Sequence, residues 1–263
     1  MKTVADILAY LETLAPQSMK MDWDNVGLLC GSASPPVSKM LVALDPFEHV
    51  CAEAAEIGAQ LVVTHHPLIF QPTKAITDDT SIGRSILLLI RNGISAINAH
   101  TNLDCAPGGV NDVLANTLGL EQIQVINPSG VDEKGQNWGL LRQGQVPAQE
   151  LEVFLTHVKE KLDCSGLRYV SGGKPVHKVA VGGGACAGAI REVHDAGCDT
   201  FVTADVKYNQ FWDAQELGLN LIDAGHFATE NPVCQYLAEK LQAAFPEIEV
   251  VISKNHADCM KFF

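Results

Sequence analysis

Short apolar runs alternate with helical patterns along most of this chain, and that alternation limits the folds open to it. The first half reads strand, helix, strand, helix, strand, helix at 39–45, 48–59, 60–65, 81–93, 94–100 and 108–120. Gly58, Gly93 and Gly119 stand where the helices should end, as glycine commonly does at a helix C-terminus. This order predicts an α/β fold with a largely parallel sheet.

A second series of the same kind follows a stretch that is rich in Gly, Asn and Pro. We interpret that stretch, 127–147, as a connection between domains, and an amphipathic helix follows at 148–163. Strands and helices then alternate at 177–185, 188–197, 198–205, 210–218, 219–225, 232–245 and 249–253. We therefore expect two α/β domains. Their expected ranges are 1–125 completed by 223–263, and 126–222.

The two series resemble each other. The segment "EIGAQLVVTHH" at 56–66 aligns with "DAGCDTFVTAD" at 195–205 at a constant offset of 139 residues. In the same order, "NGISAINAHTNLD" at 92–104 parallels "LGLNLIDAGHFATE" at 217–230. We infer two related halves. The alternative is that α/β proteins share the same residue preferences at the ends of their strands.

Composition excludes several classes of protein. The 263 residues carry a net charge of −13, which disfavours nucleic-acid binding because phosphate backbones are repelled. A phosphorylated small substrate stays open, since a metal ion can invert the local charge. No run of eighteen apolar residues predicts a membrane span, and the N-terminus predicts an amphipathic helix rather than a signal peptide. The eight scattered cysteines indicate reduced thiols, so we expect a cytoplasmic protein.

Metal-ligand side chains stand at the predicted strand ends, where parallel α/β sheets bind their ligands. They are His65 and His66, His100 with Asp104, Asp205, and His226 with Glu230. Imidazole and carboxylate together suit zinc, iron, manganese or nickel. Adjacent strand residues face opposite ways, but at a strand end before Pro67 the doublet His65 and His66 can diverge onto two neighbouring ions.

Three histidines and two carboxylates are enough for a dinuclear site whose remaining positions are filled by water. A carboxylate can bridge two ions because it has two oxygens. The alternative for a single histidine at a strand end is a polar side chain satisfied by hydrogen bonds. We interpret five histidines in that way, namely His49, His157, His177, His194 and His256.

Two other motifs have structural and functional interpretations. The glycine-rich run at 179–188 follows a strand and opens a helix, as phosphate-binding loops do. It lacks the Gly-Lys-Ser/Thr of nucleotide loops, so we favour a tight turn. For Trp23, Asp24 and Asn25 both interpretations stay open, a cavity wall or a packing corner in which Asp24 caps a turn.

Five segments together resemble the Nif-three-like family, whose members carry the label GTP cyclohydrolase 1 type 2 homologue. They are "WDNVGLLCG", "VVTHHPLIF", "INAHTNLDCAPGGVND", "TADVKYNQ" and "LIDAGHFATE", in order along nearly the whole chain. The length is similar to the short form of the family, without its inserted domain. Two positions depart from the family pattern, Ala204 where glycine is usual and Asn209 where histidine is usual. Because an amide does not titrate, Asn209 cannot transfer a proton.

The resemblance implies a fold and a site. It implies two interlocked α/β domains, with the metal site between them, and a homohexameric ring built as a trimer of dimers. It also implies two divalent ions per chain, zinc, iron, manganese or nickel, and it implies no other cofactor. The ligands that it implies are His65, His66, Asp104, His226 and Glu230.

Two functions are compatible with such a chain. The first is metal-dependent hydrolysis of a nucleotide or of a phosphorylated or heterocyclic small molecule, with water activated by two metals. In that case His100 is the candidate for proton transfer or for orienting a ligand, because it lies just before Asp104. The second is a non-catalytic scaffold or regulator that acts through its ring. No nucleic-acid or membrane partner is expected in either case.

Overall fold

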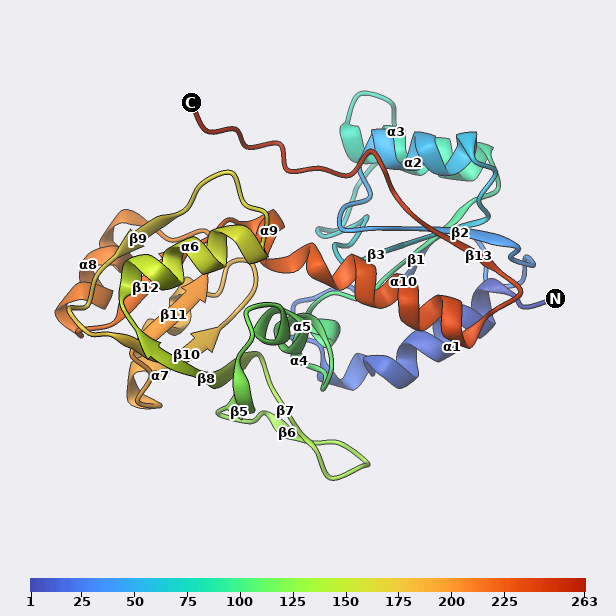
Figure 1. Cartoon of the computed structure of the whole chain (residues 1–263). Helices are drawn as coiled ribbons and strands as arrows, with labels where there is room; N and C mark the ends of the chain where they lie inside the picture. The colour runs from blue at the N-terminus through green and yellow to red at the C-terminus, as the bar shows by residue number, and fades with distance from the viewer. The chain divides into compact units, whose positions relative to one another are not determined.

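The computed structural model describes residues 1–263 and divides into two compact units, each with its own sheet (Figure 1). Unit 1 contains Met1–Leu103 and Val233–Ala257, and unit 2 contains Asp104–Pro232 and Asp258–Phe263. The helices and sheets confirm the predicted α/β class. The units divide at Leu103 and Pro232 rather than at the expected 125 and 222, because the segment after Leu103 leads into β5 of the second sheet; the last strand belongs to unit 1, as in the expected ranges.

Unit 1 is built on a five-stranded sheet of order β1-β4-β3-β2-β13. Its strands are β1 (Gly27–Cys30), β2 (Lys39–Ala43), β3 (Leu61–Thr64), β4 (Ser95–Asn98) and β13 (Glu249–Ile252). All neighbours are parallel except β1 and β4. The helices are α1 (Val4–Leu14), η1 (Gln17–Met19), α2 (Glu48–Glu56), α3 (Ser81–Arg91) and α10 (Pro232–Ala244), and α4 (Thr101–Cys105) follows β4.

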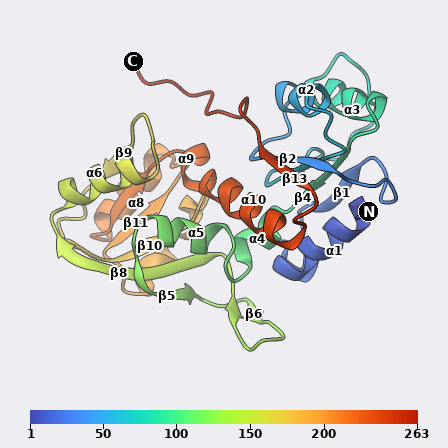
Figure 2. The same cartoon turned by 45° about the vertical axis from the view of Figure 1, so that its right-hand side comes forward.

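Alternation along the strands explains the layers of unit 1. Leu41 and Val62 belong to the cluster formed with α2 and α3, while their neighbours Val42 and Val63 are equally buried and face the other way. Figures 1 and 2 show α1 and α10 on that second face. Both faces are covered, so the residues in the middle of β2 and β3 are apolar on both faces, as in parallel strands generally.

Unit 2 is built on a six-stranded sheet of order β5-β8-β10-β11-β12-β9, with a short β6-β7 hairpin beside it. The strands are β5 (Glu121–Ile126), β6 (Gly130–Val131), β7 (Asn137–Trp138), β8 (Leu141–Gln149), β9 (Arg168–Val170), β10 (Val176–Val181), β11 (Thr200–Thr203) and β12 (Asn220–Asp223). The helices are α5 (Val110–Thr117), α6 (Leu151–Lys161), η2 (Ala187–Ala189), α7 (Ile190–Asp195), α8 (Tyr208–Glu216) and α9 (His226–Glu230).

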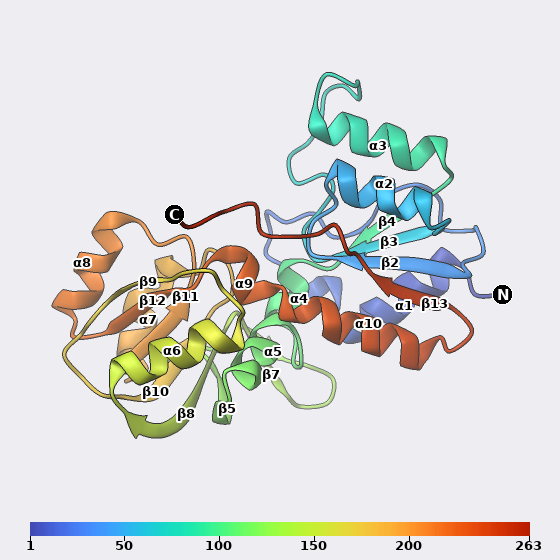
Figure 3. The same cartoon turned by 45° about the horizontal axis from the view of Figure 1, so that its top comes forward.

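The sheet of unit 2 also separates two apolar layers. Val202 and Ile222 pack with residues of α5 and α6, whereas their neighbours Phe201 and Leu221 pack with residues of α7 and α8. Figure 3 shows α5 and α6 in front of this sheet. None of the helices in either unit combines the length and apolar character that a bilayer-spanning segment requires.

The stretch at 127–147 is more ordered than the sequence predicted. Residues 141–147 belong to β8, which pairs antiparallel with β5 on one side and β10 on the other. The interpretation as a connection was therefore wrong for this part of the stretch. Gly144 weakens the strand signal, yet a Cβ there would lie 2.8 Å from the Cβ of Leu120, so glycine allows close packing in the sheet.

The internal similarity is confirmed by the strand registers. In unit 1, Met40 pairs with Leu61, and in unit 2, Val179 pairs with Thr200, so both partners are shifted by 139 residues. The next strand repeats this relation, because β3 pairs with β4 as β11 pairs with β12, in register over four residues each. The repeat thus extends over three successive parallel strands, more than shared residue preferences at strand ends explain.

The C-terminal segment of unit 1 is fastened by one buried carboxylate on α2. Glu53 accepts hydrogen bonds from the Ser253 hydroxyl at 2.5 Å and from the Lys254 amide at 2.9 Å. Burial raises the pKa of this carboxyl, but hydrogen bonds from Lys254, Ser253 and the Asn255 amide outweigh it and leave the pKa below its ordinary value of 4.5. The ionised form therefore stabilises the folded state.

A Glu53→Gln variant is expected to be less stable than the wild type at neutral pH. Because the folded-state pKa is lowered, the carboxylate contributes above the unfolded value near 4.5, and its contribution is lost as the pH falls through the folded-state value. The difference in unfolding free energy, measured by urea unfolding across a pH series, should shrink at acid pH. Glu56→Gln, at an exposed position of α2, is the control, and an equal pH dependence in both variants would contradict the assignment.

Candidate metal centre

Three imidazoles of unit 1 converge beyond the ends of β3 and β4. His65 and His66 directly follow β3, and His100 lies between β4 and α4. Their candidate ligand nitrogens all lie within 4.8 Å of one another. The ring centroids of His65 and His66 are 5.0 Å apart, and that of His100 lies 5.2 Å from His65. The rings of His65 and His66 therefore turn toward a common point. Their spacing is compatible with one bound ion or with two.

Each of these rings is oriented by an oxygen at Nδ1. His65 Nδ1 lies 2.9 Å from the Ala99 carbonyl, and His66 Nδ1 lies 2.7 Å from Asp45 Oδ1. A carbonyl or carboxylate oxygen only accepts, so Nδ1 carries the proton in both rings and Nε2 holds the lone pair. Metal-binding histidines are commonly fixed by such contacts, which set the tautomer and raise the basicity of the ligand nitrogen.

His100 has the same kind of support. Its Nδ1 lies 2.8 Å from Oδ1 of the buried Asp24, whose Oδ2 accepts from the Thr101 amide at 3.0 Å. Burial raises the pKa of Asp24, but hydrogen bonds from His100 and Thr101 outweigh it and hold the pKa well below its ordinary value. Trp23 is 63% exposed and its ring meets that of His100 at 6.2 Å. Asp24 therefore organises a packing corner, as one interpretation of this segment expected, while Trp23 stays exposed beside His100.

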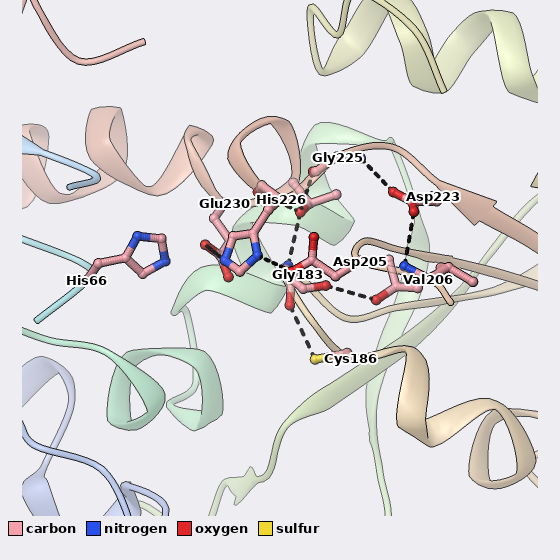
Figure 4. Close-up of polar contacts among 12 residues, drawn as sticks. His66, Gly183, Cys186, Asp205, Val206, Asp223, Gly225, His226 and Glu230 are labelled. Carbon is pink, nitrogen blue, oxygen red and sulfur yellow. Dashed lines mark hydrogen bonds and ion pairs between the residues drawn. The ribbon is translucent and has the colours of Figure 1, made fainter. Parts of the chain in front are cut away.

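Unit 2 carries a second set of ligand side chains, on α9 (Figure 4). His226 Nδ1 lies 2.8 Å from Asp205 Oδ2, and His226 Nε2 lies 3.1 Å from Glu230 Oε2. Two atoms bonded to one ion at about 2.1 Å lie roughly 3.0–3.4 Å apart, so this N–O separation has the size expected for a shared ion. Asp205 supports His226 as Asp45 supports His66, although the repeat aligns Asp205 with His66 rather than with Asp45.

Asp223, at the end of β12, fixes the backbone around this pair. It accepts from the Val206 amide at 3.0 Å and from the Gly225 amide at 3.1 Å. These amides follow Asp205 and precede His226 in the chain, and Figure 4 shows both bonds. The Asp223 carboxylate therefore holds together two loops, one that carries the candidate ligand His226 and one that carries its supporting residue Asp205.

The glycine-rich run after β10 lies directly against His226 and Glu230. Gly184 has φ +60°, and a Cβ there would lie 2.2 Å from Glu230 Oε1 and 3.0 Å from His226 Nε2. Gly183 donates to Asn111 Oδ1 at 2.7 Å, and Gly184 donates to Thr229 Oγ1 at 3.0 Å. The amides are thus used within the protein. The run is a tight turn that makes room for a ligand pair, as the sequence favoured over a phosphate loop.

Asp104, on α4, lies near the Cys186 thiol in unit 2, as Glu230 does. Its carbonyl accepts from Asn111 Nδ2 at 3.2 Å, and its side chain is 7% exposed. Burial raises the pKa of the Cys186 thiol, and the carboxylates of Asp104 and Glu230 raise it further. Both carboxylates therefore act on one buried thiol, and the thiol stays protonated and is no candidate nucleophile.

Sequence reasoning named the candidate ligands but missed residues that support them, among them Asp45 and Asp223. Asp45 orients His66, and the sequence offered a signal for it, because it ends the strand pattern at 39–45. Among the histidines interpreted as ordinary polar residues, His157 and His177 each place a ring nitrogen near a main-chain carbonyl, at 3.0 and 2.6 Å.

An Asp45→Ala variant is expected to bind divalent metal 10- to 100-fold more weakly, because loss of an orienting carboxylate typically costs that much. The affinity can be measured by competition with a chromogenic chelator. Asp78→Ala removes a carboxylate from an exposed loop of the same unit and should leave the affinity unchanged. Equal affinities in the two variants would show that Asp45 has no part in orienting a ligand.

Comparison with known proteins agrees with the resemblance seen in the motifs. A model of the family described as Duf34/NIF3 (NGG1p interacting factor 3) matches residues 2–259. The chain is 36% identical over 261 residues to the GTP cyclohydrolase 1 type 2 homolog of Clostridium perfringens, with 98% of each chain covered. It is 34% identical over 266 residues to the protein of the same name from Clostridium acetobutylicum, again with 98% of each covered.

A solved structure extends the comparison to the fold. The crystal structure of a Bacillus cereus protein related to NIF3 superposes with a TM-score of 0.94 at 28% identity, covering 100% of this chain and 99% of that one. The family model, the relatives and this structure all span nearly the whole length. The chain therefore belongs to the Duf34/NIF3 family.

Proposed function

We propose that this protein is a hydrolase that depends on two divalent metal ions and acts on a small molecule. The ligands in this proposal are His65 and His66 of unit 1 with Asp104, His226 and Glu230 of unit 2. The observation that carries it is the shared orientation of the imidazoles, since each Nδ1 of His65, His66 and His226 faces an oxygen acceptor. Such oriented imidazoles, combined with carboxylates, are the donor set of zinc, iron, manganese or nickel sites.

The number of donors supports an enzyme rather than a closed structural site. Five side chains shared between two ions leave coordination positions for water and substrate, whereas structural sites are filled by protein ligands. When bound, two such ions supply a hydroxide near neutral pH and polarise the group that it attacks. Glu230 and Asp104 would each be suited to binding both ions, because a carboxylate offers two oxygens.

His100 is assigned to proton transfer next to this centre. Its Nε2 side lies with the ligand nitrogens of His65 and His66, while Nδ1 is held by the Asp24 carboxylate. A proton taken up at Nε2 would create an imidazolium, which the ionised Asp24 stabilises. A general base needs such a fixed ring within reach of the proton that it removes. Asn209 takes no part, because an amide does not titrate.

Metal add-back tests the hydrolase proposal. Protein stripped with a chelator would be supplied in turn with zinc, iron(II), manganese or nickel, and screened on amides, phosphoesters and nucleotides, with GTP among them because of the relatives' name. Hydrolysis is expected only after metal is restored, and a His66→Ala variant should lose it. An activity equal in stripped and restored protein would contradict the proposal.

A metal-loaded protein without hydrolytic activity across this screen would favour the scaffold alternative. In that case the homohexamer implied by the family resemblance becomes the functional form. Light scattering after gel filtration measures the mass of the assembly directly. A monomer in both the loaded and the stripped protein would contradict a ring-based role.

A further inference from the structure

Unit 1 contains a cavity of about 480 Å³ directly beside one of its metal-type histidines. His66 and the Asp45 carboxylate that orients it form one side of this cavity, which we name the His66 cavity. Its volume lies within the usual range of small-molecule sites. The rest of the wall is largely apolar, with Pro46, Phe47, Pro67, Leu68, Phe70 and Ile82 among its residues, and its polar side chains are Gln71, Thr73, Ser81 and Ser85.

Aromatic rings gather at this cavity and remain exposed. Phe47 and Phe70 are 54% and 45% exposed, although burial of such rings is favourable. Trp23 stands behind Phe70 with ring centroids 5.7 Å apart, and Phe70 in turn lies 6.1 Å from the His100 ring. A group of exposed aromatic side chains around a concave site commonly marks a binding surface.

The charge of the wall restricts the occupant. No lysine or arginine lines the His66 cavity, and its one ionised side chain is the Asp45 carboxylate. The nearby Arg84 is committed to Glu48 at 2.7 Å and to the Asp78 carbonyl at 2.9 Å. The first turn of α3 reaches the wall, but the Thr80 hydroxyl already accepts from the Gly83 amide there. The side chains of the wall therefore supply no lysine or arginine to balance a polyphosphate.

We propose that the His66 cavity holds an uncharged, flat apolar group of the substrate, an aromatic or heteroaromatic ring, and excludes polyphosphate. The inference rests on the proposed function, because it names the substrate class of the same site. Rings would pack against Phe47 and Phe70, and the few polar side chains of the wall would orient them. The triphosphate of a nucleotide such as GTP has no place in this cavity.

Binding to metal-free protein tests the cavity independently of hydrolysis. Indole, an uncharged bicyclic ring, and inorganic triphosphate would be titrated by calorimetry in the presence of a chelator. Indole is expected to bind, and Phe70→Ala should weaken it roughly tenfold through loss of an aromatic contact and its buried area. Tyr208→Ala, which removes a 78% exposed ring from unit 2, should have no effect.

Each other outcome overturns the proposal. Equal binding of indole to the Phe70 and Tyr208 variants would place its site elsewhere, and no binding of indole at all would leave the cavity without the proposed occupant. Triphosphate binding that Phe70→Ala or a Phe47→Ala variant weakens would make the cavity a polyphosphate site. Because all titrations use stripped protein, indole binding without any metal-dependent hydrolysis would refute the proposed function and leave the cavity assignment standing.

Discussion

Replacing Arg142 with methionine is expected to lower the free energy of unfolding by about 3–5 kcal/mol, the usual cost of removing one partner from a buried ion pair. The Arg142 side chain is 1% exposed. Its Nε and Nη2 both donate to the Asp112 carboxylate at 2.9 Å, and Nη1 donates to the Gly139 carbonyl at 2.6 Å. The variant strands a carboxylate that is only partly exposed and leaves a buried carbonyl without its donor.

Two further variants isolate this effect in urea unfolding. Arg84→Met breaks a pair with Glu48 whose side chains are 40% and 45% exposed, so it should cost no more than about 1 kcal/mol. Arg142→Met combined with Asp112→Leu removes both charges, and much of the loss should return because an apolar pair is often tolerated in such places. A small loss in Arg142→Met, equal to that in Arg84→Met, would contradict the assignment.

Arg142 also has consequences for the candidate site. Its Nη2 donates to the carbonyls of Ala106 and Cys105, at 3.1 and 3.3 Å, directly after Asp104. The guanidinium therefore fixes the chain that leaves one expected ligand. Sequence reasoning did not find this residue, because an arginine in a polar stretch is usually on the surface, and only the pairing of β8 with both neighbours buries it.

Replacing Gly184 with alanine is expected to abolish metal binding in unit 2 while the fold survives. The added Cβ would lie 2.2 Å from Glu230 Oε1, so the carboxylate must leave the position in which it meets His226. We expect the metal affinity to fall at least about 100-fold, the upper end of the cost of disturbing a residue that supports a ligand. The left-handed backbone adds roughly 1–2 kcal/mol of instability.

Gly197→Ala is the matched control for this variant. Gly197 has φ +76°, so alanine is strained there as well, but the nearest atom to its Cβ would be Lys178 Nζ at 3.7 Å. The two variants should lose similar stability in thermal unfolding, and only Gly184→Ala should lose metal in calorimetric titration. Equal metal affinities in both would show that the contact with Glu230 is irrelevant to binding.

The fold class and the repeat were predictable because parallel strands are apolar on both faces and the helices end at glycine. Four strand registers, two in each unit, confirm the alignment at 56–66 and at 92–104. Strand β8 of unit 2 was not predictable in the same way. β8 contains Gly144 and Pro147, and its ladder depends on partners 15 to 39 residues away in the sequence.

The candidate ligands were predictable because histidine and carboxylate stand at successive strand ends, and the resemblance to the family selected among them. The contacts that support these ligands could be identified only in the folded structure. The contact of His66 with Asp45 and the approach of Gly184 to Glu230 join residues that are distant in the sequence, and no local pattern encodes them. The sequence left two roles open for His100, proton transfer or orienting a ligand. Its contact with Asp24 is what favours proton transfer.

The central proposal is that two divalent ions are held by five side chains, His65, His66, Asp104, His226 and Glu230. Mass spectrometry of metals in protein purified without added metal or chelator tests it most directly. We predict close to two transition-metal ions per chain, and loss of both in a His66→Ala, Glu230→Ala double variant but not in a His194→Ala, Glu239→Ala surface control. No tightly bound metal in the folded wild-type protein would contradict the account.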